Sequence, residues 1–489
     1  MATTNIDYTQ LITNALNNYQ GTELYTKLSQ IHHQAVDNGD DITYPANRAI
    51  YLTVPPSAPY SMPLPPNTNF NGCHFIVTNN AHNLPLFSMK AEGTEISFNR
   101  SDIWKWNNLA SSYPSLGPGP KLLSITDAHW TYAYSSYFDR QDILFINNHV
   151  IQNAPITGYG DCLVEPSYLC YDVTTAQKTI KNAKLTRASG STYITKFLWI
   201  VGQYNVKVSN IEIYTPSPGN LTGDVCISVY DSAKIVLQNV SFNGTYSNES
   251  NYGYGISFNN VWDSSFINIS CTNTIWGLFG NRCVNTAYLS GCSINRFDVH
   301  CYGRDILCEN CTFKKTSSLS VTSHIYNRYS SMYGYVTYRN CTFEYFRPLR
   351  IDPAYNAYTP FSMTMENCTL KVSNFSKCIV DLMEFNTAVN SRTELSQKFL
   401  PSITIENLTL QASSDVSSIC IFKSIYDVQL SDALSPTMGD VSINITSYTQ
   451  DGSGTKILVD CDHAFNLKTN GNITVKKKGL GSALIPVYL

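Results

Sequence analysis

One short segment, Arg296-Phe-Asp298-Val-His300, carries three side chains that could perform acid–base chemistry. On a β-strand, Arg296, Asp298 and His300 would share one face, while Phe297 and Val299 would point to the other, interior side. Neighbours in such a row lie roughly 7 Å apart. An Asp beside an Arg stays ionised, and a His beside an Asp holds its proton better. We therefore predict an exposed row that acts as acid, base and anion clamp on a sugar.

Two other uses of this row stay open. The three side chains could bind a ligand without performing chemistry on it, or they could be a charged ladder that only keeps the surface soluble. Asp298 and Arg347 stand six residues after the Cys of equivalent repeat phrases, so in register they would lie on one face roughly 10 Å apart. Arg350 and Asp352 would extend that patch.

Glycosidic hydrolysis needs two carboxyl groups about 5–9.5 Å apart. Asp298 could pair with Asp305 or with Asp352, and Asp381 could pair with Glu384. The Asp381 pair is more typical of an ordinary exposed loop. The predicted catalytic residues are Arg296, Asp298, His300 and Asp305.

Tyrosines gather downstream of this segment, in the stretch from Tyr326 to Tyr335 and again at Tyr345, Tyr355 and Tyr358. A Tyr ring has a flat apolar face and a hydroxyl, which suits pyranose stacking and subunit contacts equally. Simple stacking of aromatic rings along the flank of the fold is a third possibility. The predicted substrate-binding residues are Arg347, Arg350, Asp352, Tyr333, Tyr335 and Tyr355.

A possible metal or redox motif, Cys308-Glu-Asn-Cys311, lies close to His300 and Cys301. On a strand, however, residues three apart point to opposite faces. We therefore predict no metal site and no cofactor.

A recurring phrase must position all of these residues: Asn or Gly, a small or apolar residue, Ser or Thr, then an apolar residue. Copies begin at Asn239, Asn268, Gly291, Asn310, Asn340, Asn367, Asn407, Asn444 and Asn472, with looser copies at Asn182 and Asn210. From 182 onward the steps are 28, 29, 29, 23, 19, 30, 27, 40, 37 and 28 residues. A period near 20–30 residues is typical of a solenoid with one coil per repeat.

The pattern within each repeat favours a parallel β-helix over its alternative, a β-sandwich. Apolar and polar residues alternate, which places one row inside and the next in water. Equivalent residues should then stack about 4.8 Å apart, Asn over Asn and Cys over Cys. Asn tolerates a left-handed backbone conformation, so we expect it at the corners. The two longest steps should carry a loop to one side.

Composition narrows the functional classes. The chain has 489 residues, 43% of them apolar and 14% charged, and a formal net charge of −3. The near-neutral charge and the lack of Lys/Arg runs argue against nucleic-acid binding. No apolar run is long enough to span a bilayer, and no signal peptide is visible. The 15 Cys, many inside the phrase, suit a ladder of free thiols in a reducing cytosol.

Three segments follow from these patterns. Residues 1–41 are predicted to be a helical N-terminal cap or attachment segment, because apolar positions recur there at helical spacing. Residues 42–475 are predicted to form the β-helix, although 101–180 are irregular and aromatic. Residues 476–489 should be a C-terminal tail or cap.

The segments Ile42-Thr-Tyr-Pro45 and Leu64-Pro-Pro-Asn-Thr-Asn-Phe-Asn-Gly72-Cys-His-Phe resemble the opening coil of pectin-lyase-like right-handed β-helix proteins. Within that superfamily the chain most resembles phage tailspikes and related β-helix proteins of gut Bacteroidetes. The segments 292–300 and 347–355 look most family-like, and the resemblance covers about 42–475. The signatures of polygalacturonases and of calcium-dependent pectate lyases are missing, so a pectic substrate is not expected.

The resemblance implies an all-β, right-handed parallel β-helix with a short α-helical N-terminal segment. It implies a phage tailspike or tail-fibre-like protein that binds, and could cleave, a bacterial surface glycan as a polysaccharide depolymerase. Such a protein is made in the host cytoplasm, becomes part of the virion tail, forms a homotrimer and contacts other tail proteins through its N-terminal segment. The alternatives are a bacterial polysaccharide lyase or glycoside hydrolase, extracellular or on the cell surface, and a non-catalytic structural virion component.

Overall fold

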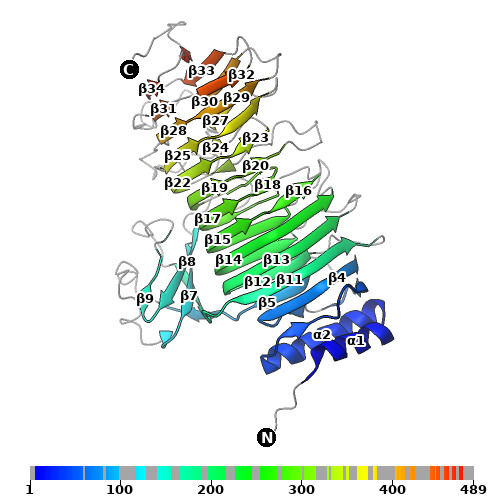
Figure 1. Ribbon diagram of the computed structural model, residues 1–489. Coiled ribbons are helices and arrows are strands. Elements are labelled where there is room, and N and C mark those ends of the chain that lie inside the picture. Colours follow the sequence, from blue (N-terminus) through cyan, green and yellow to red (C-terminus); the bar gives the residue numbers. More distant parts are fainter. Residues whose placement is uncertain are drawn as a thin grey trace.

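The structure of the chain, a computed structural model, is an elongated stack of β-strands with two helices at its N-terminal end (Figure 1). It describes residues 6–58, 61–80, 84–97, 116–127, 140–153, 155, 166–188, 196–215, 226–244, 254–272, 278–299, 302–314, 328–329, 332–344, 349–351, 361–372, 378–382, 402–412, 418–424, 441–445, 448–451, 456–461, 465–469 and 473–476.

The helices, the first coils and an inserted sheet occupy the first part of the chain. The helices are α1 (Tyr8–Asn18) and α2 (Gly21–Asn38). The first coils contain β1 (Ile42–Thr43), β2 (Ala49–Val54), β3 (Met62–Pro63), β4 (Asn67–Asn79) and β5 (Pro85–Lys90). The inserted strands are β6 (Thr94–Ile96), β7 (Lys121–Asp127), β8 (Arg140–Asn147), β9 (Val150–Ile151) and β10 (Ser167–Asp172).

The remaining strands form the body of the stack. Its middle contains β11 (Lys178–Arg187), β12 (Lys196–Val201), β13 (Tyr204–Thr215), β14 (Ile227–Gly244), β15 (Ile256–Ile267), β16 (Ser270–Thr272), β17 (Arg282–Ser290), β18 (Ser293–Ile294), β19 (Gly303–Glu309) and β20 (Thr312–Phe313). The next strands are β21 (Arg328–Tyr329), β22 (Met332–Arg339), β23 (Thr342–Phe343), β24 (Leu349–Ile351), β25 (Phe361–Glu366), β26 (Thr369–Val372) and β27 (Cys378–Leu382). The last are β28 (Ser402–Glu406), β29 (Leu408–Ala412), β30 (Ser418–Ser424), β31 (Val441–Ile445), β32 (Tyr448–Asp451), β33 (Lys456–Cys461), β34 (Phe465–Thr469) and β35 (Ile473–Lys476).

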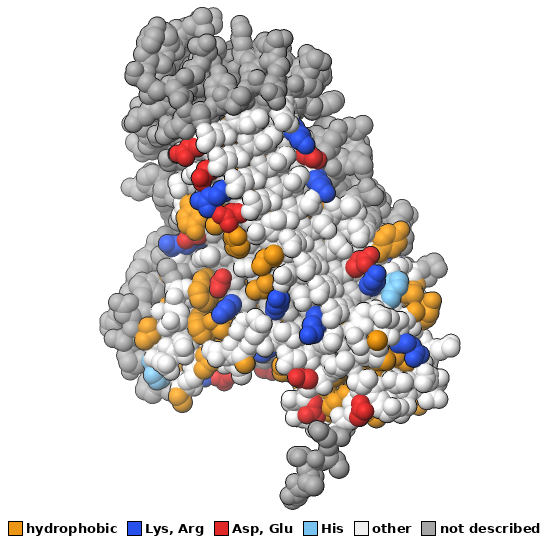
Figure 2. Space-filling model, viewed as in Figure 1, with side chains coloured by type: hydrophobic (Ala, Val, Ile, Leu, Met, Phe, Trp, Pro, Cys, Tyr) orange, Lys and Arg blue, Asp and Glu red, His pale blue; other side chains and the backbone are white. Residues whose placement is uncertain are grey.

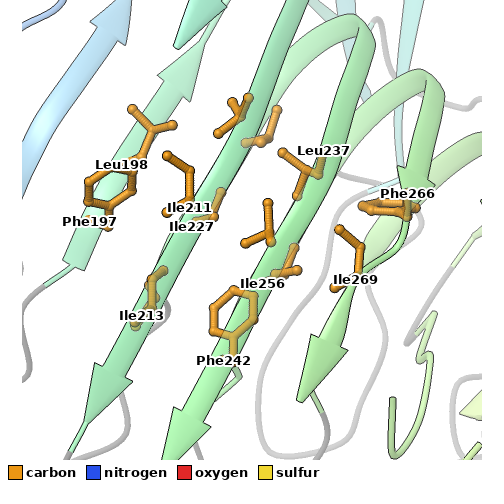
Figure 3. Close-up of a cluster of buried hydrophobic side chains, with 14 of the residues drawn as sticks. Phe197, Leu198, Ile211, Ile213, Ile227, Leu237, Phe242, Ile256, Phe266 and Ile269 are labelled. Carbon is orange, nitrogen blue, oxygen red and sulfur yellow. The ribbon is translucent and has the colours of Figure 1, made fainter. Parts of the chain in front are cut away.

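Parallel pairing between successive coils confirms the predicted β-helix. A 24-stranded parallel sheet winds around one axis, and a six-stranded parallel sheet (β21, β24, β27, β30, β33 and β35) runs beside it in the C-terminal half (Figure 1). Register is kept from coil to coil: Val208 pairs with Leu237, and Leu237 with Phe266. These inward side chains stack into one continuous apolar core (Figure 3).

Three columns of left-handed corners shape the coils around β13–β19. One corner is the Asn or Gly of the repeat phrase, and the other two lie five and eight residues before it. The corner positions are 202, 205 and 210, then 231, 234 and 239, then 260, 263 and 268, then 283, 286 and 291, then 302, 305 and 310. We call the column of phrase residues the Asn corner and the column five residues earlier the second corner.

The Asn corner behaves as the repeat predicted. Its residues have positive φ, for example 55° at Asn210 and 53° at Asn239. The Nδ2 of Asn239 donates to the Oδ1 of Asn210 at 3.0 Å, and Asn268 donates to Asn239 at 3.1 Å. At Gly291 (φ 63°) a Cβ would lie only 2.6 Å from the Oδ1 of Asn268, so glycine is required there.

The predicted stack of thiols is also confirmed. The prediction that Cys308 and Cys311 point to opposite faces, however, is wrong. Cys292, Cys311, Cys341 and Cys368 are free, buried and occupy successive coils. Cys308 and Cys311 both point inward rather than to opposite faces, because the left-handed Asn310 between them turns the chain. No group of three or more His, Cys, Asp or Glu in the described residues is arranged to hold a metal ion.

The helices pack on the first coils, with Leu24, Leu28 and Ala35 of α2 belonging to the same apolar core as the strands. His32 of α2 is fully buried against the first coils; its Nδ1 lies 2.8 Å from the Pro63 carbonyl and its Nε2 2.7 Å from the Tyr44 hydroxyl. No helix in the described ranges is both long and apolar enough to cross a membrane.

An antiparallel sheet interrupts the β-helix where the sequence looked irregular. It has the strand order β6-β10-β7-β8-β9 and stands against the flank of the coils (Figure 1). The Phe145 ring stacks on Tyr204 at 4.1 Å between centroids. Asp231 accepts hydrogen bonds from Ser124 (2.8 Å) and from Tyr171 (3.0 Å), which joins the inserted sheet to the β-helix.

Candidate functional site

The predicted exposed row of Arg296 and Asp298 is wrong. Both side chains are buried, at 2% and 0% exposure, and they form an ion pair with each other. The segment after β18 is a loop rather than a strand, so strand alternation does not apply, and Phe297 and Val299 are buried as well. The Asp298 carbonyl accepts a hydrogen bond from the Asn281 backbone at 3.1 Å, which holds the loop against the preceding coil.

Most of the other predicted residues lie where no side chain is described. His300, Arg347, Asp352 and Tyr355 lie outside the described residues. Tyr333 belongs to strand β22, and Arg350 belongs to β24, where it pairs with Arg328 on one side and Asp381 on the other. Their roles stay predictions.

Two predicted residues, Asp305 and Tyr335, are brought together on adjacent coils. Asp305 is a second-corner residue, and its Oδ1 accepts a hydrogen bond from the Tyr335 backbone N–H at 3.3 Å. The Arg304 Nε lies 3.4 Å from the other carboxylate oxygen, while Arg304 Nη1 donates to the Pro155 carbonyl at 2.9 Å. Gly334 (φ 68°) makes this approach possible, since a Cβ there would collide with the Asp305 carboxylate.

A second group of charged side chains, absent from the predictions, runs alongside the Asn corner. It lies on the outer side of β19, β22 and β25. Arg339 Nη1 donates to Glu309 at 2.6 Å, and Arg339 Nε donates to Glu366 at 2.8 Å. The Tyr288 hydroxyl donates to the other Glu309 oxygen at 2.8 Å. The sequence does carry a signal for these residues: Glu309, Arg339 and Glu366 each directly precede the Asn-Cys of a repeat phrase.

We call these seven residues the charged face: Tyr288, Arg304, Asp305, Glu309, Tyr335, Arg339 and Glu366. They stand out because the surface around them is mostly uncharged, and Figure 2 shows charged side chains only singly or in small groups of mixed sign. Tyr335 is 40% exposed, so its ring can meet a ligand.

The chemistry of the charged face favours binding over acid catalysis at Glu309. Hydrogen bonds from Tyr288 and Arg339 lower the pKa of the Glu309 carboxyl, so it stays ionised and cannot donate a proton at neutral pH. Ionised carboxylates accept hydrogen bonds from sugar hydroxyls, and guanidinium groups donate to sugar oxygens and anionic substituents.

Comparison with known proteins bears on the fold. No family model matches the chain, and no curated protein matches it. Among solved structures, the tailspike protein gp49 of Pseudomonas phage LKA1 is similar with a TM-score of 0.51 and 13% identity, covering 94% of this chain and 76% of the other.

Two further tailspikes are similar to a comparable degree. The gp61 tailspike of Pseudomonas phage phi297 has a TM-score of 0.59 and 12% identity over 92% of this chain and 74% of its own. The gp54 tailspike of Acinetobacter baumannii phage AP22, solved in complex with A. baumannii capsular saccharide, has a TM-score of 0.54 and 12% identity over 95% and 73%. The chain therefore shares the parallel β-helix fold of these phage tailspikes.

Proposed function

We propose that this protein is a tailspike-like component of a phage tail that binds a bacterial surface polysaccharide through the charged face. The observation that carries the proposal is the charged face itself: carboxylates, guanidinium groups and an exposed Tyr ring, contributed by adjacent coils of a rigid scaffold. The similarity in fold to three phage tailspikes, one solved with a capsular saccharide, supports the same ligand class.

Assembly is part of the proposal. The chain forms a homotrimer, α1 and α2 contact other tail proteins, and synthesis takes place in the host cytoplasm. The buried free thiols of the described coils support folding in a reducing compartment. Light scattering of the purified chain tests the trimer, and a monomeric mass would contradict it.

Arg339 offers the sharpest test of binding. We expect Arg339→Ala to weaken the affinity for capsular polysaccharides purified from gut Bacteroidetes strains by about 10- to 100-fold. The substitution removes a charged donor and leaves Glu309 and Glu366 facing each other without their shared cation. Surface plasmon resonance on immobilised polysaccharide measures the change.

The matched control is Lys371→Ala, because Lys371 pairs with Glu344 at 3.5 Å on a neighbouring face and is similarly exposed. Equal affinities of the wild type and Arg339→Ala for the polysaccharide would show that the charged face does not bind it.

Hydrolysis of the polysaccharide is a second candidate function, favoured by the placement of Asp263 and Asp305. Through the pairing of β15, β17 and β19, both lie at the second corner with Thr286 between them, so their Cα atoms are about 10 Å apart. Side-chain rotation can bring the carboxyl groups within the range used by inverting glycosidases. Burial raises the pKa of Asp263, against the opposing effect of Lys234, which suits a general acid.

For this activity we expect Asp263→Asn to lower the release of new reducing ends at least 100-fold while retaining polysaccharide binding. Thr286→Ser, between the two Asp residues, is the matched control and should keep the rate. A wild-type protein that binds the polysaccharide without releasing reducing ends would leave binding as the function.

A further inference from the structure

A shallow groove of about 490 Å³ follows the Asn corner at the N-terminal end of the β-helix. It lies on a different part of the molecule from the charged face, since two coil steps, roughly 10 Å, separate the coil of Asn239 from that of Tyr288, the nearest residue of that face. The corner residues that line it are Asn47, Asn71, Asn182, Asn210 and Asn239.

The amides of this groove keep hydrogen-bonding capacity after making their ladder. Asn210 Nδ2 donates one hydrogen to Asn182 Oδ1 at 2.9 Å, and Asn239 repeats this contact on the next coil. Each amide nitrogen has a second hydrogen, and each amide oxygen has a second lone pair. The groove therefore offers donors and acceptors at intervals of about 4.8 Å along the axis.

The groove has no net charge from its lining. Among the lining residues, all within the described ranges, Lys184 and Glu212 alone are ionisable, and they pair with each other at 3.1 Å while remaining 55% and 46% exposed. On the adjacent surface, His74 lies beside Lys184 and contacts the Thr186 hydroxyl at 2.6 Å. Burial, and then the charge of Lys184, lower the pKa of His74, so it is neutral at pH 7.

Two exposed Tyr rings stand beside the groove. Tyr51 is 62% exposed and Tyr214 is 45% exposed, and each follows its corner Asn by four residues. Strand pairing links Tyr51 to Ile76, Ile76 to Thr186 and Thr186 to Tyr214, so the rings lie three coils, about 14 Å, apart. Figure 2 shows hydrophobic, acidic, basic and His side chains gathered at the right margin, at the level of β4, β11 and β13.

We propose that this groove is a second carbohydrate site, which binds an uncharged stretch of a polysaccharide lying parallel to the β-helix axis. Tyr51 and Tyr214 stack against sugar rings, the corner amides and Ser241 exchange hydrogen bonds with sugar hydroxyls, and the Lys184–Glu212 pair presents one donor and one acceptor without net charge. The ligand class rests on the proposed function, whereas the groove and its neutrality do not.

The test is binding to an array of purified bacterial capsular polysaccharides and O-antigens, sorted into uncharged and anionic members. We expect the wild type to bind uncharged members, and Tyr51→Ala and Tyr214→Ala each to weaken that binding about tenfold. Val150→Ala, which removes an exposed apolar side chain from the inserted sheet outside both proposed sites, is the control and should leave binding to uncharged members unchanged. The double variant Lys184→Gln/Glu212→Gln keeps the neutrality and should retain most of the affinity.

Three results would overturn the inference: a wild type that binds anionic members alone, Tyr51 and Tyr214 variants that bind like the wild type, or a fall in the oligomeric mass of those variants by light scattering. The last result would assign this surface to subunit contact. If Arg339→Ala abolishes binding while the Tyr51 and Tyr214 variants do not, the second site fails and the proposed function stands. If the wild type binds no member of the array, both fail.

Discussion

Replacing Asp298 by Ala is expected to lower the free energy of unfolding by about 3–5 kcal/mol. The reason is that Asp298 has no exposure to solvent and is the ion-pair partner of Arg296, which is itself almost fully buried. Removing the carboxylate takes the paired anion away from a buried guanidinium. Guanidinium-induced unfolding, followed by circular dichroism, measures the loss.

The control for this substitution is Glu344→Ala, which breaks the exposed Lys371–Glu344 pair and should cost at most about 1 kcal/mol. The double variant Arg296→Met/Asp298→Leu removes both charges and should recover at least half of the loss, since an apolar pair carries no desolvation penalty. A loss below 1 kcal/mol for Asp298→Ala would mean that solvent reaches this loop in the folded state.

Lowering the pH from 6.5 to 4 is expected to weaken the attachment of α1 and α2 to the first coils by about 3 kcal/mol. Burial lowers the pKa of His32 to about 4 from its usual 6.5. Between these values the unfolded state binds a proton that the folded state excludes, so stability rises with pH in this window. The contribution of neutral His32 is complete above pH 6.5 and is lost as the pH falls through 4.

Hydrogen exchange of the α2 amides across pH 4–7, corrected for the intrinsic rate, measures this effect. Replacing His32 by Gln removes the titrating group and should flatten the dependence on pH, at some cost in packing. The adjacent His33 is exposed, so His33→Gln should keep the dependence. If His32→Gln retained the full pH dependence, another group would have to be responsible.

The repeat phrase predicted the stacking of the coils because its information is local. A corner that needs positive φ selects Asn or Gly. Among the copies of the phrase that begin between residues 182 and 407, the one at Gly291 alone has Gly in place of Asn. The residue after the corner points inward in every coil for which it is described, so Ile269, Cys292 and Leu408 are interchangeable apolar residues there. Neither feature depends on distant parts of the chain.

The candidate site was only partly predictable. Asp305 and Tyr335 were identified as candidates, but their meeting depends on the extra residue at Gly334, which shifts the register between β19 and β22. Glu309, Arg339 and Glu366 were missed, although each precedes an Asn of the phrase. The inward residues of the phrase place the core, whereas these charges stand in the outward position just before the corner.

Sequence alone determined that this chain coils in parallel, where the Asn corner lies and which side chains stack inside, because all three follow from the backbone preferences of a phrase of four residues. Tertiary structure alone decided which ionisable residues face water. The loop after β18 folds against the preceding coil and buries Arg296 and Asp298, and α2 packs His32 against Tyr44 and Pro63 while leaving His33 exposed. Burial of these groups depends on contacts between segments far apart in the chain, which no local pattern records.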